Sequence, residues 1–248
     1  MLKNIRHIHY KRFFFTVNDY FLADTLQLNA DINYCIQCLE NIENSLSEFH
    51  TLLIDLRQTQ ESIQTGIYHR TVSEINSFLT NQPYDYKLLY TISAVDLDNF
   101  IALFNTFAKV KRIRRAEAFR LKAYNKQGIL AISFLKQKEE FLYINFYRLT
   151  QERACNIYSF SPYTNTNEEI NNTQLGRAHR ALHWLDILEF KKSGVKYYDF
   201  CGWYTGNSDK NLLNINKFKE QFTQTKVVEY SGVIYKNKFL RFILKFIR

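Results

Sequence analysis

The sequence is poor in proline and glycine and has no long apolar run. It contains 2 Pro and 7 Gly in 248 residues, which excludes collagen-like chains and long flexible linkers. No run of about 18 apolar residues is present, so no membrane-spanning helix is predicted. Residues 1–15 carry charges through their apolar part, unlike a secretory signal peptide. We therefore expect a cytoplasmic protein.

Cysteine is also scarce, and its four positions fit reduced thiols in that compartment: Cys35, Cys38, Cys155 and Cys201. Cys35 and Cys38 form a C-x-x-C pattern, which is typical of half a zinc site or of a redox pair. A structural zinc needs four ligands, and no second pair follows at a useful spacing. Residues 32–42 also fit a helix, in which cysteine is a small apolar residue. We favour that helix and expect no metal.

The sequence contains enough apolar residues to form a hydrophobic core. Hydrophobic residues make up 46% and aromatic residues 16% of the chain, so it is not disordered. The length allows one large domain or two small ones.

Basic residues are concentrated in two segments, 109–115 and 236–248. Together they hold ten of the 33 Lys and Arg. The remaining 23 are balanced by the 24 acidic residues of the chain, so the rest of the chain is nearly neutral. For residues 109–115, contact with tRNA or CoA phosphates competes with a solvated connection between helices, which we favour. For 236–248, binding of an anionic membrane surface and packing on the protein's own core are equally supported.

Hydrophobic periodicity predicts alternating strands and helices. The expected strands are 12–17, 50–56, 84–92, 129–136, 140–149, 155–162, 196–200 and 226–235, and the expected helices are 58–80, 96–110, 114–124, 175–195 and 211–222. This order favours an α/β (α+β) fold with a mixed sheet and helices on both faces. We expect an N-terminal strand–helix portion over 1–85, a main domain over 86–235, and a basic amphipathic tail over 236–248.

Residues 171–203 and 215–232 carry a pattern that resembles the Fem-type branch of the GNAT acyltransferase superfamily, which includes the transferases that build peptidoglycan bridges. The matching residues are Gly176, Ala178, Leu182, His183, Trp184, Tyr198, Asp199, Phe200, Gly202, Phe218, Lys219, Phe222, Glu229 and Tyr230. Residues 50–71 resemble an earlier strand and helix of that family, so the resemblance covers about 50–235. It implies a GNAT-like, mostly antiparallel sheet flanked by helices, with 1–85 as a degenerate half.

The resemblance also implies a site for an acyl donor. It places the phosphates of the donor at the start of a helix, over Thr173, Gln174, Leu175, Gly176, Arg177 and Ala178. A helix start is a favourable anion site, and Gly176 would allow close approach. An ordinary helix start capped by Thr173 is the alternative. Three departures from the family pattern leave the donor open: Thr173 stands where the donor loop begins with Arg or Gln, Cys201 replaces a family glycine, and residues 221–224 lack the family's glycines.

Two charged residues are candidates for catalysis. Asp199 ends a predicted strand, where it could act as a base on an amine or cap the following turn. Lys219 matches the family's lysine, which implies that it stabilises an oxyanion or a donor phosphate. The candidate substrate-binding residues are His183, Gly202, Trp203, Tyr204 and Phe218. His179 and His183 have the spacing of a metal pair, but no acid lies between them, and we expect no metal there.

The sequence therefore supports three functions. The first is an N-acyltransferase that moves an acyl group from acyl-CoA, most simply acetyl-CoA, to an amine of an amino sugar or of another cell-envelope precursor, either free or lipid-linked. The second uses aminoacyl-tRNA as the donor. The third is a non-catalytic module that binds nucleic acid or a membrane surface, and the near-neutral remainder of the chain argues against it. The first two place the protein in the cytoplasm, either free or at the inner face of the membrane.

Overall fold

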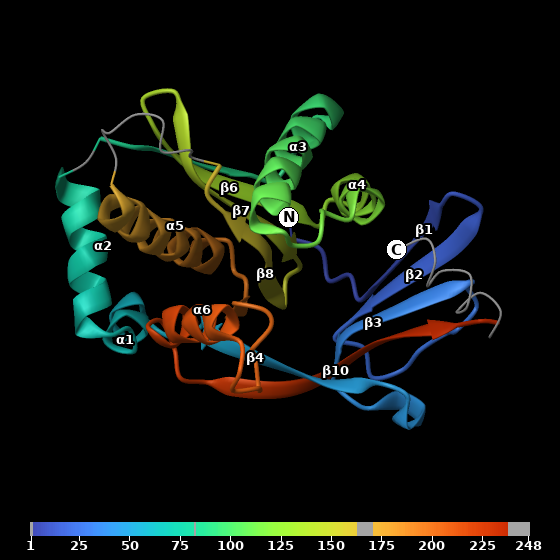
Figure 1. Cartoon of the computed structure of the whole chain (residues 1–248). Coiled ribbons are helices and arrows are strands. Elements are labelled where there is room, and N and C mark those ends of the chain that lie inside the picture. The colour runs from blue at the N-terminus through green and yellow to red at the C-terminus, as the bar shows by residue number, and fades with distance from the viewer. Residues whose placement is uncertain (1, 82, 163–170, 238–248) are drawn as a thin grey trace. The chain divides into compact units, whose positions relative to one another are not determined.

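The computed structural model describes residues 2–81, 83–162 and 171–237. The chain divides into two compact units (Figure 1). The first falls within residues 1–3 and 52–225, and the second within residues 4–51 and 226–248. These limits differ from the expected boundaries at 85 and 235, because the last strand returns to pair with a strand near the N-terminus. The predicted tail lies outside the described residues from residue 238 onward.

The first unit is built on a mixed sheet. Its strands are arranged in the order β4-β9-β8-β7-β6-β5. Every neighbouring pair is antiparallel except β8 and β9, which are parallel. The strands are β4 (Ser47–Asp55, whose last four residues belong to this unit), β5 (Asp85–Leu89), β6 (Leu130–Gln137), β7 (Glu140–Leu149), β8 (Arg153–Phe160) and β9 (Tyr197–Asp199).

Helices cover both faces of this sheet (Figure 1). Alternate side chains of a strand point to opposite faces. On β7, Phe146 meets Phe100 of α3 (Ala94–Lys111), whereas Tyr147 meets Phe190 of α5 (Asn172–Lys192). α4 (Ala118–Gln127) follows α3, and α2 (His69–Asn81) packs beside α5. The unit also contains α1 (Gln60–Thr65) and α6 (Lys210–Glu220).

The second unit is a smaller sheet with the order β1-β2-β3-β10. Its elements are β1 (His7–Arg12), β2 (Phe15–Phe21), β3 (Ile32–Cys38), β10 (Lys226–Tyr235) and the short 3-10 helix η1 (Ile42–Asn44). β3 pairs with β2 in parallel and with β10 in antiparallel orientation. The expected helix over 32–42 is therefore wrong. Cys35 and Cys38 are buried free thiols on a strand, and Gln37, with φ 56°, interrupts its regular alternation.

Most of the other expected elements are confirmed, as is the mixed fold class. The expected helix over 58–80 is divided at Gly66 into α1 and α2, and the expected strand over 12–17 is a hairpin of β1 and β2. Among the described residues, no helix is both long and apolar enough to cross a membrane.

Candidate functional site

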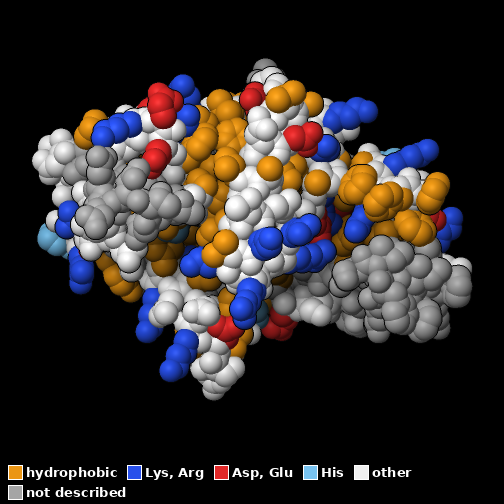
Figure 2. Space-filling model, turned by 45° about the horizontal axis from the view of Figure 1, so that its top comes forward, with side chains coloured by type: hydrophobic (Ala, Val, Ile, Leu, Met, Phe, Trp, Pro, Cys, Tyr) orange, Lys and Arg blue, Asp and Glu red, His pale blue; other side chains and the backbone are white. Residues whose placement is uncertain are grey.

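A groove of about 630 Å³ opens in the first unit where α3, β8 and α5 meet. Its walls are mostly apolar, and Figure 2 shows hydrophobic side chains in the central part of that view with Lys and Arg side chains nearby. The groove is lined by Leu103, Thr106, Phe107, Val110, Lys111, Tyr143, Ser159, Phe160, Ser161, Pro162, Asn172, Leu175 and His179. An apolar groove with a few polar groups is the usual form of a ligand site.

The pairing of two strands accounts for the position of the groove. On its β8 side, β9 pairs with the first three residues of β8, Arg153–Cys155, and with no later residue of that strand. β8 continues for five residues beyond this pairing, to Phe160, and its later residues Ser159 and Phe160 line the groove. In open sheets of this kind, ligands bind beyond the carboxyl ends of parallel strands. The groove lies at such an end.

The predicted donor-binding segment lies in the first two turns of α5 and is not a loop. Asn171 is the N-cap, and its side chain forms a capping box with Gln174, so the alternative of a Thr173 cap is wrong. Of the six predicted donor-binding residues, Leu175 lines the groove. Its neighbour Asn172, at the first position of the helix, lines it as well, so the helix start contributes to the groove.

The role of Gly176 can be tested without strain on the backbone. A methyl group at this position would come within 3.2 Å of Nη1 of Arg180, the end of a flexible side chain. Alanine is a better helix former than glycine by roughly 1 kcal/mol. We therefore expect Gly176→Ala to keep or raise the melting temperature. If a donor phosphate approaches the backbone at Gly176, the same variant binds the donor more weakly, as titration calorimetry would measure. Unchanged donor affinity would contradict the prediction that Gly176 binds the donor.

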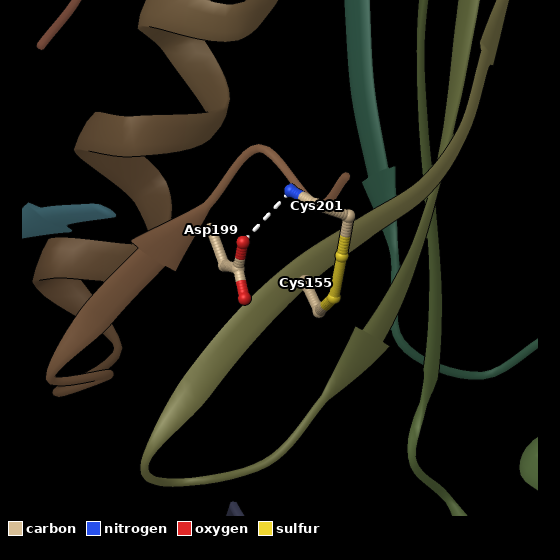
Figure 3. Close-up of side chains that lie close together, drawn as sticks. All are labelled: Cys155, Asp199 and Cys201. Carbon is tan, nitrogen blue, oxygen red and sulfur yellow. Dashed lines mark hydrogen bonds between the residues drawn. A yellow bond between two sulfur atoms is a disulfide. The ribbon is translucent and has the colours of Figure 1, made fainter. Parts of the chain in front are cut away.

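Asp199 is buried at the end of β9 (Figure 3). One carboxylate oxygen lies 3.1 Å from Nη1 of Arg153, and the other accepts a hydrogen bond of 2.7 Å from the backbone N–H of Cys201. This is the geometry of a carboxylate that caps a turn, the alternative to a base. The structure therefore gives Asp199 a role in holding the turn, and its role as a base stays a prediction.

The turn after Asp199 is fixed by two further links. Cys201 and Gly202 both have left-handed backbones, with φ 46° and 49°, and the Lys219 ammonium donates to both of their carbonyl oxygens. A disulfide also joins Cys201 to Cys155 of β8, so the expectation of reduced thiols is wrong for this pair. The structure thus brings the two predicted catalytic residues to one turn.

Burial lowers the pKa of Lys219 to about 8, although the charge of Asp199 opposes this shift. An ammonium with such a pKa can release its proton near neutral pH. In the structure the Lys219 ammonium donates hydrogen bonds to two carbonyl oxygens of the turn, those of Cys201 and Gly202. Lys219 is not among the groove-lining residues, so action on an oxyanion or a phosphate stays a prediction.

The predicted substrate-binding residues lie in different places. Gly202 is exposed, whereas Trp203 packs partly buried against the core. The backbone N–H of Tyr204 donates to the side chain of Asn216. Phe218 of α6 stacks on the His179 ring with 4.3 Å between centroids. His183 is 2% exposed, so it is positioned to act through neighbouring side chains rather than on a substrate.

A chain of hydrogen bonds runs from the groove into the interior, and we call it the histidine–tyrosine chain. Its members are, in order, Ser159, His179, His183, Tyr198, Tyr147 and Asp186. The five successive distances are 2.9, 3.0, 2.5, 2.8 and 2.6 Å. The two members at one end, Ser159 and His179, line the groove. Oγ of Ser159 and Nε2 of His183 both contact the same nitrogen, Nε2, of His179, so this nitrogen is the point where the groove meets the part of the chain that ends at a buried carboxylate.

The electrostatics of this chain keep both histidines neutral. Burial lowers the pKa of His179 to about 3, and the nearby Arg180 adds to the shift. Burial also lowers the pKa of His183 well below its usual value, with contributions from His179 and Lys219. Burial raises the pKa of Asp186 to about 6, although four side-chain donors lower it: Tyr147, Asn145, Ser133 and Tyr86. Within the chain, Asp186 is thus the group that takes up a proton near neutral pH.

Sequence reasoning missed Ser159, Tyr147, Tyr198 and Asp186 as parts of a site. His179, His183 and Asp186 follow one another at spacings of four and three residues, which places them on one face of α5. Apolar residues surround them in the sequence. Three polar side chains on the buried face of a helix were a signal that could have been read.

The sulfurs of Cys155 and Cys201 and a carboxylate oxygen of Asp199 lie within 4.8 Å of one another (Figure 3). Such donors can bind zinc when they are free. Here the sulfurs are bonded to each other, and Asp199 is ion-paired with Arg153. The cluster acts as a cross-link in this structure.

No family model matches the chain. One curated protein, the DNA-directed RNA polymerase subunit beta of Tupiella akineta, is 28% identical over 219 residues. The match covers 71% of this chain and 10% of that protein, so the chain spans about a tenth of its relative's length.

Solved structures resemble the chain more extensively. FemX superposes with a TM-score of 0.56 at 10% identity, over 79% of this chain and 64% of FemX, slightly less than two thirds of it. The C-terminal domain of a putative lysylphosphatidylglycerol synthetase from Agrobacterium fabrum gives 0.53 at 11% identity, over 87% of this chain and 70% of that one. L-PGS from Bacillus licheniformis gives 0.50 at 13% identity, over 86% and 71%. The protein therefore has a fold like that of FemX and of these two other structures, so the Fem-like fold expected from the sequence is confirmed.

Proposed function

We propose that the protein is a transferase that moves an acyl or aminoacyl group from a carrier bound in the groove to an amine. One observation carries this proposal: an apolar groove at the start of α5 ends on two polar groups, Ser159 and His179, that are linked to a buried carboxylate. Direct transfer to an amine requires a bound acyl group and a path for the amine proton. The groove can bind the acyl group, and the neutral imidazole of His179 at its wall can accept a proton.

For the donor, we propose acyl-CoA, with acetyl-CoA as the simplest case. The apolar walls suit a thioester arm, and Lys111 at the groove suits a phosphate of the carrier. Exposed cations continue from Lys111 into the segment that follows α3. The acceptor amine would belong to an amino sugar or another envelope precursor, and a lipid-linked precursor would suit a basic tail at a membrane surface.

Aminoacyl-tRNA is the second candidate donor. The same exposed cations next to the groove suit an RNA backbone. The name of the lysylphosphatidylglycerol synthetase neighbour indicates transfer of a lysyl group, which fits this donor. A non-catalytic binding module is the third candidate, and it assigns no use to the histidine–tyrosine chain.

The donor can be identified by thermal shift. A ligand at 100 times its dissociation constant stabilises the native state by about 2.7 kcal/mol, or roughly 5–10 °C for a chain of this size. We expect acetyl-CoA to raise the melting temperature by that amount. A rise with charged tRNA alone would identify the second donor. No rise with either, together with no transfer to an amino sugar, would refute the proposal.

A matched pair of variants on α3 tests the location of the donor. Val110 lines the groove and is 73% exposed, whereas Val95 is 71% exposed and is not among the groove-lining residues. We expect Val110→Glu to raise the KM for an anionic donor about tenfold, because the new carboxylate repels the carrier's phosphates. We expect Val95→Glu to leave the KM unchanged. Equal effects of the two substitutions would place the donor elsewhere.

A further inference from the structure

The turn between β1 and β2 presents two adjacent phenylalanines, Phe13 and Phe14, which we call the hairpin tip. Phe14 is 97% exposed, the largest value among the described large apolar side chains, and Phe13 is 64% exposed. Single exposed apolar side chains are common on protein surfaces, whereas adjacent ones that form a patch mark a contact surface. The hairpin tip belongs to the second unit, and no step of the proposed function uses it.

The backbone of the hairpin tip is unfavourable for the residues that occupy it. Arg12 pairs with Phe15, so Phe13 and Phe14 form a two-residue turn. Turns of this length favour Asn-Gly, Asp-Gly or another pair with glycine, because they require positive φ. Phe13 has φ 54°, a left-handed conformation that is costly for a bulky side chain. The two rings therefore weaken the turn that presents them, which is expected where they serve a contact with another molecule.

The hairpin extends past the rest of the second sheet. β3 pairs with β2 over Val17–Phe21, and the first residue of β3, Ile32, lies opposite Val17. The hairpin tip therefore lies beyond the start of β3. Figure 1 shows the turn of the hairpin, the start of β3 and the end of β10 at the same end of this sheet.

The basic C-terminal segment begins at that end as well. The end of β10 pairs with the start of β3, and the backbone N–H of Lys236 donates to the carbonyl oxygen of Asp31. The Asp31 carboxylate accepts hydrogen bonds from the backbone and the side chain of Thr16 on β2, and the charge of Lys236 acts on it. Residues 236–248 therefore start from a point that is bonded to the base of the hairpin.

The charges of the hairpin are positive. Residues 1–18 contain four Lys and Arg and no acidic residue. Two of the four, Lys11 and Arg12, lie within three residues of Phe14, or roughly 10 Å along the hairpin. Lys11 is exposed and Arg12 is half-buried. The hairpin thus carries apolar rings at its tip and cations directly behind them.

We propose that the hairpin tip inserts into the surface of a bilayer that contains anionic lipids, with the two rings at the acyl chains and Lys11 and Arg12 at the headgroups. Aromatic rings of surface-bound segments lie about 5–10 Å into the boundary between headgroups and acyl chains, and nearby cations add attraction to anionic lipids. Residues 236–248, five of which are Lys or Arg, suit the same surface. The proposal goes beyond the proposed function, since it involves neither donor nor amine.

The size of the hairpin tip favours a bilayer over a protein partner. Two phenylalanine side chains offer at most about 500 Å² of apolar surface, whereas a stable protein interface takes about 800 Å² from each partner. A bilayer needs no complementary shape, so a small tip with flanking cations is enough for a reversible contact.

Sedimentation of the full chain with vesicles tests the proposal. We expect binding to vesicles of phosphatidylcholine and phosphatidylglycerol, and about tenfold weaker binding to phosphatidylcholine alone. The double variant Phe13→Asn, Phe14→Gly introduces a pair that this turn favours, so we expect an unchanged or higher melting temperature. Its affinity for the anionic vesicles should fall about 100-fold, or about tenfold for each ring. Phe119→Ala is the matched control at a phenylalanine that is 44% exposed on α4, and it should bind like wild type.

The charge contribution is tested separately. We expect Lys11→Gln to lower the affinity for anionic vesicles about fivefold, because one cation near the surface contributes about that factor. Its affinity for phosphatidylcholine alone should not change. Equal losses on both kinds of vesicle would contradict an electrostatic role of Lys11 at the headgroups.

Tryptophan fluorescence reports insertion directly. Phe14→Trp keeps an aromatic ring of the kind that favours membrane interfaces. We expect its emission to shift to shorter wavelength when anionic vesicles are added, and we expect no shift for Phe119→Trp. The native Trp184 and Trp203, both at least partly buried, contribute the same background to the two variants.

Three outcomes would overturn the proposal. Wild-type affinity of the double variant for anionic vesicles would leave residues 236–248 as the membrane contact. An unchanged emission of Phe14→Trp on bound vesicles would show that the hairpin tip stays outside the bilayer. Binding of the wild-type chain to single-stranded RNA but to no vesicle would assign the cations of the hairpin to nucleic acid. None of these measurements involves transfer, so each leaves the proposed function in place.

Discussion

Replacing Arg153 by methionine is expected to lower the free energy of unfolding by about 3–5 kcal/mol, because it removes one cation of a buried ion pair and leaves the charged carboxylate in the interior. Arg153 and Asp199 lie 3.1 Å apart, with side chains 8% and 0% exposed. Arg148, also buried, and Lys219 are further cations that interact electrostatically with this carboxylate. Urea denaturation measures the loss as a lower midpoint at an unchanged slope.

The control is the double variant with Asp199→Asn. Asparagine keeps an oxygen that can accept the N–H of Cys201, and it removes the buried negative charge that Arg153 balances. We expect the double variant to be more stable than Arg153→Met alone, since partners in a buried pair are not additive. Equal stabilities would show that the two charges are not coupled.

If Asp199 is also a base, Asp199→Asn loses transfer activity at unchanged donor affinity. Full activity of this variant would assign Asp199 to the turn alone.

Acid is expected to destabilise the protein through His179. The pKa of this residue is about 3 in the folded chain, against 6.5 for the free side chain, so the unfolded chain binds a proton that the folded chain does not. The stabilisation is complete above about pH 6.5 and is lost as the pH falls toward 3. Between about pH 6.5 and pH 4 the loss is up to about 3 kcal/mol for this residue.

His179→Phe tests this pH dependence. Phenylalanine can keep the stack between Tyr143 and Phe218, whose centroids lie 4.2 and 4.3 Å from the histidine ring. The variant loses two hydrogen bonds at every pH, so we expect lower stability at pH 8 and a flatter decline toward pH 4. In both proteins Asp186 changes stability with pH in the opposite direction to His179, because folding raises its pKa. Its contribution is nearly the same in wild type and variant, so it largely cancels when the two stabilities are subtracted. Parallel decline in wild type and variant would contradict the prediction, and His69→Phe, at an exposed histidine, serves as the control.

The sequence was sufficient for most elements of the first unit because their periodicity agrees with their burial. β7 was predicted with its observed bounds, and α5 was predicted with a start three residues late. The second unit was harder, because β3 is a strand through pairing on both sides rather than through its local pattern. Cys35 and Cys38 fit a helix equally well by spacing, and partners distant in sequence decided between the two.

The candidate site was predicted in part. The motif residues Asp199, Gly202 and Lys219 do come together, but around one turn that they stabilise. The groove depends on where β9 stops pairing with β8, which no local pattern encodes. Ser159 and Asp186 become neighbours of the site only through the sheet and α5, so their roles required the three-dimensional arrangement.

The disulfide from Cys155 has a mechanical consequence for the groove. Cys155 is the last residue of β8 that pairs with β9. Its disulfide to Cys201 therefore lies where the two strands stop pairing. A covalent bond at this point limits how far β8 and the turn after β9 can move apart. The separation between β8 and the turn after β9 is then fixed once the chain has folded and the two thiols are oxidised, and Ser159 and Phe160, farther along β8, form one wall of the groove.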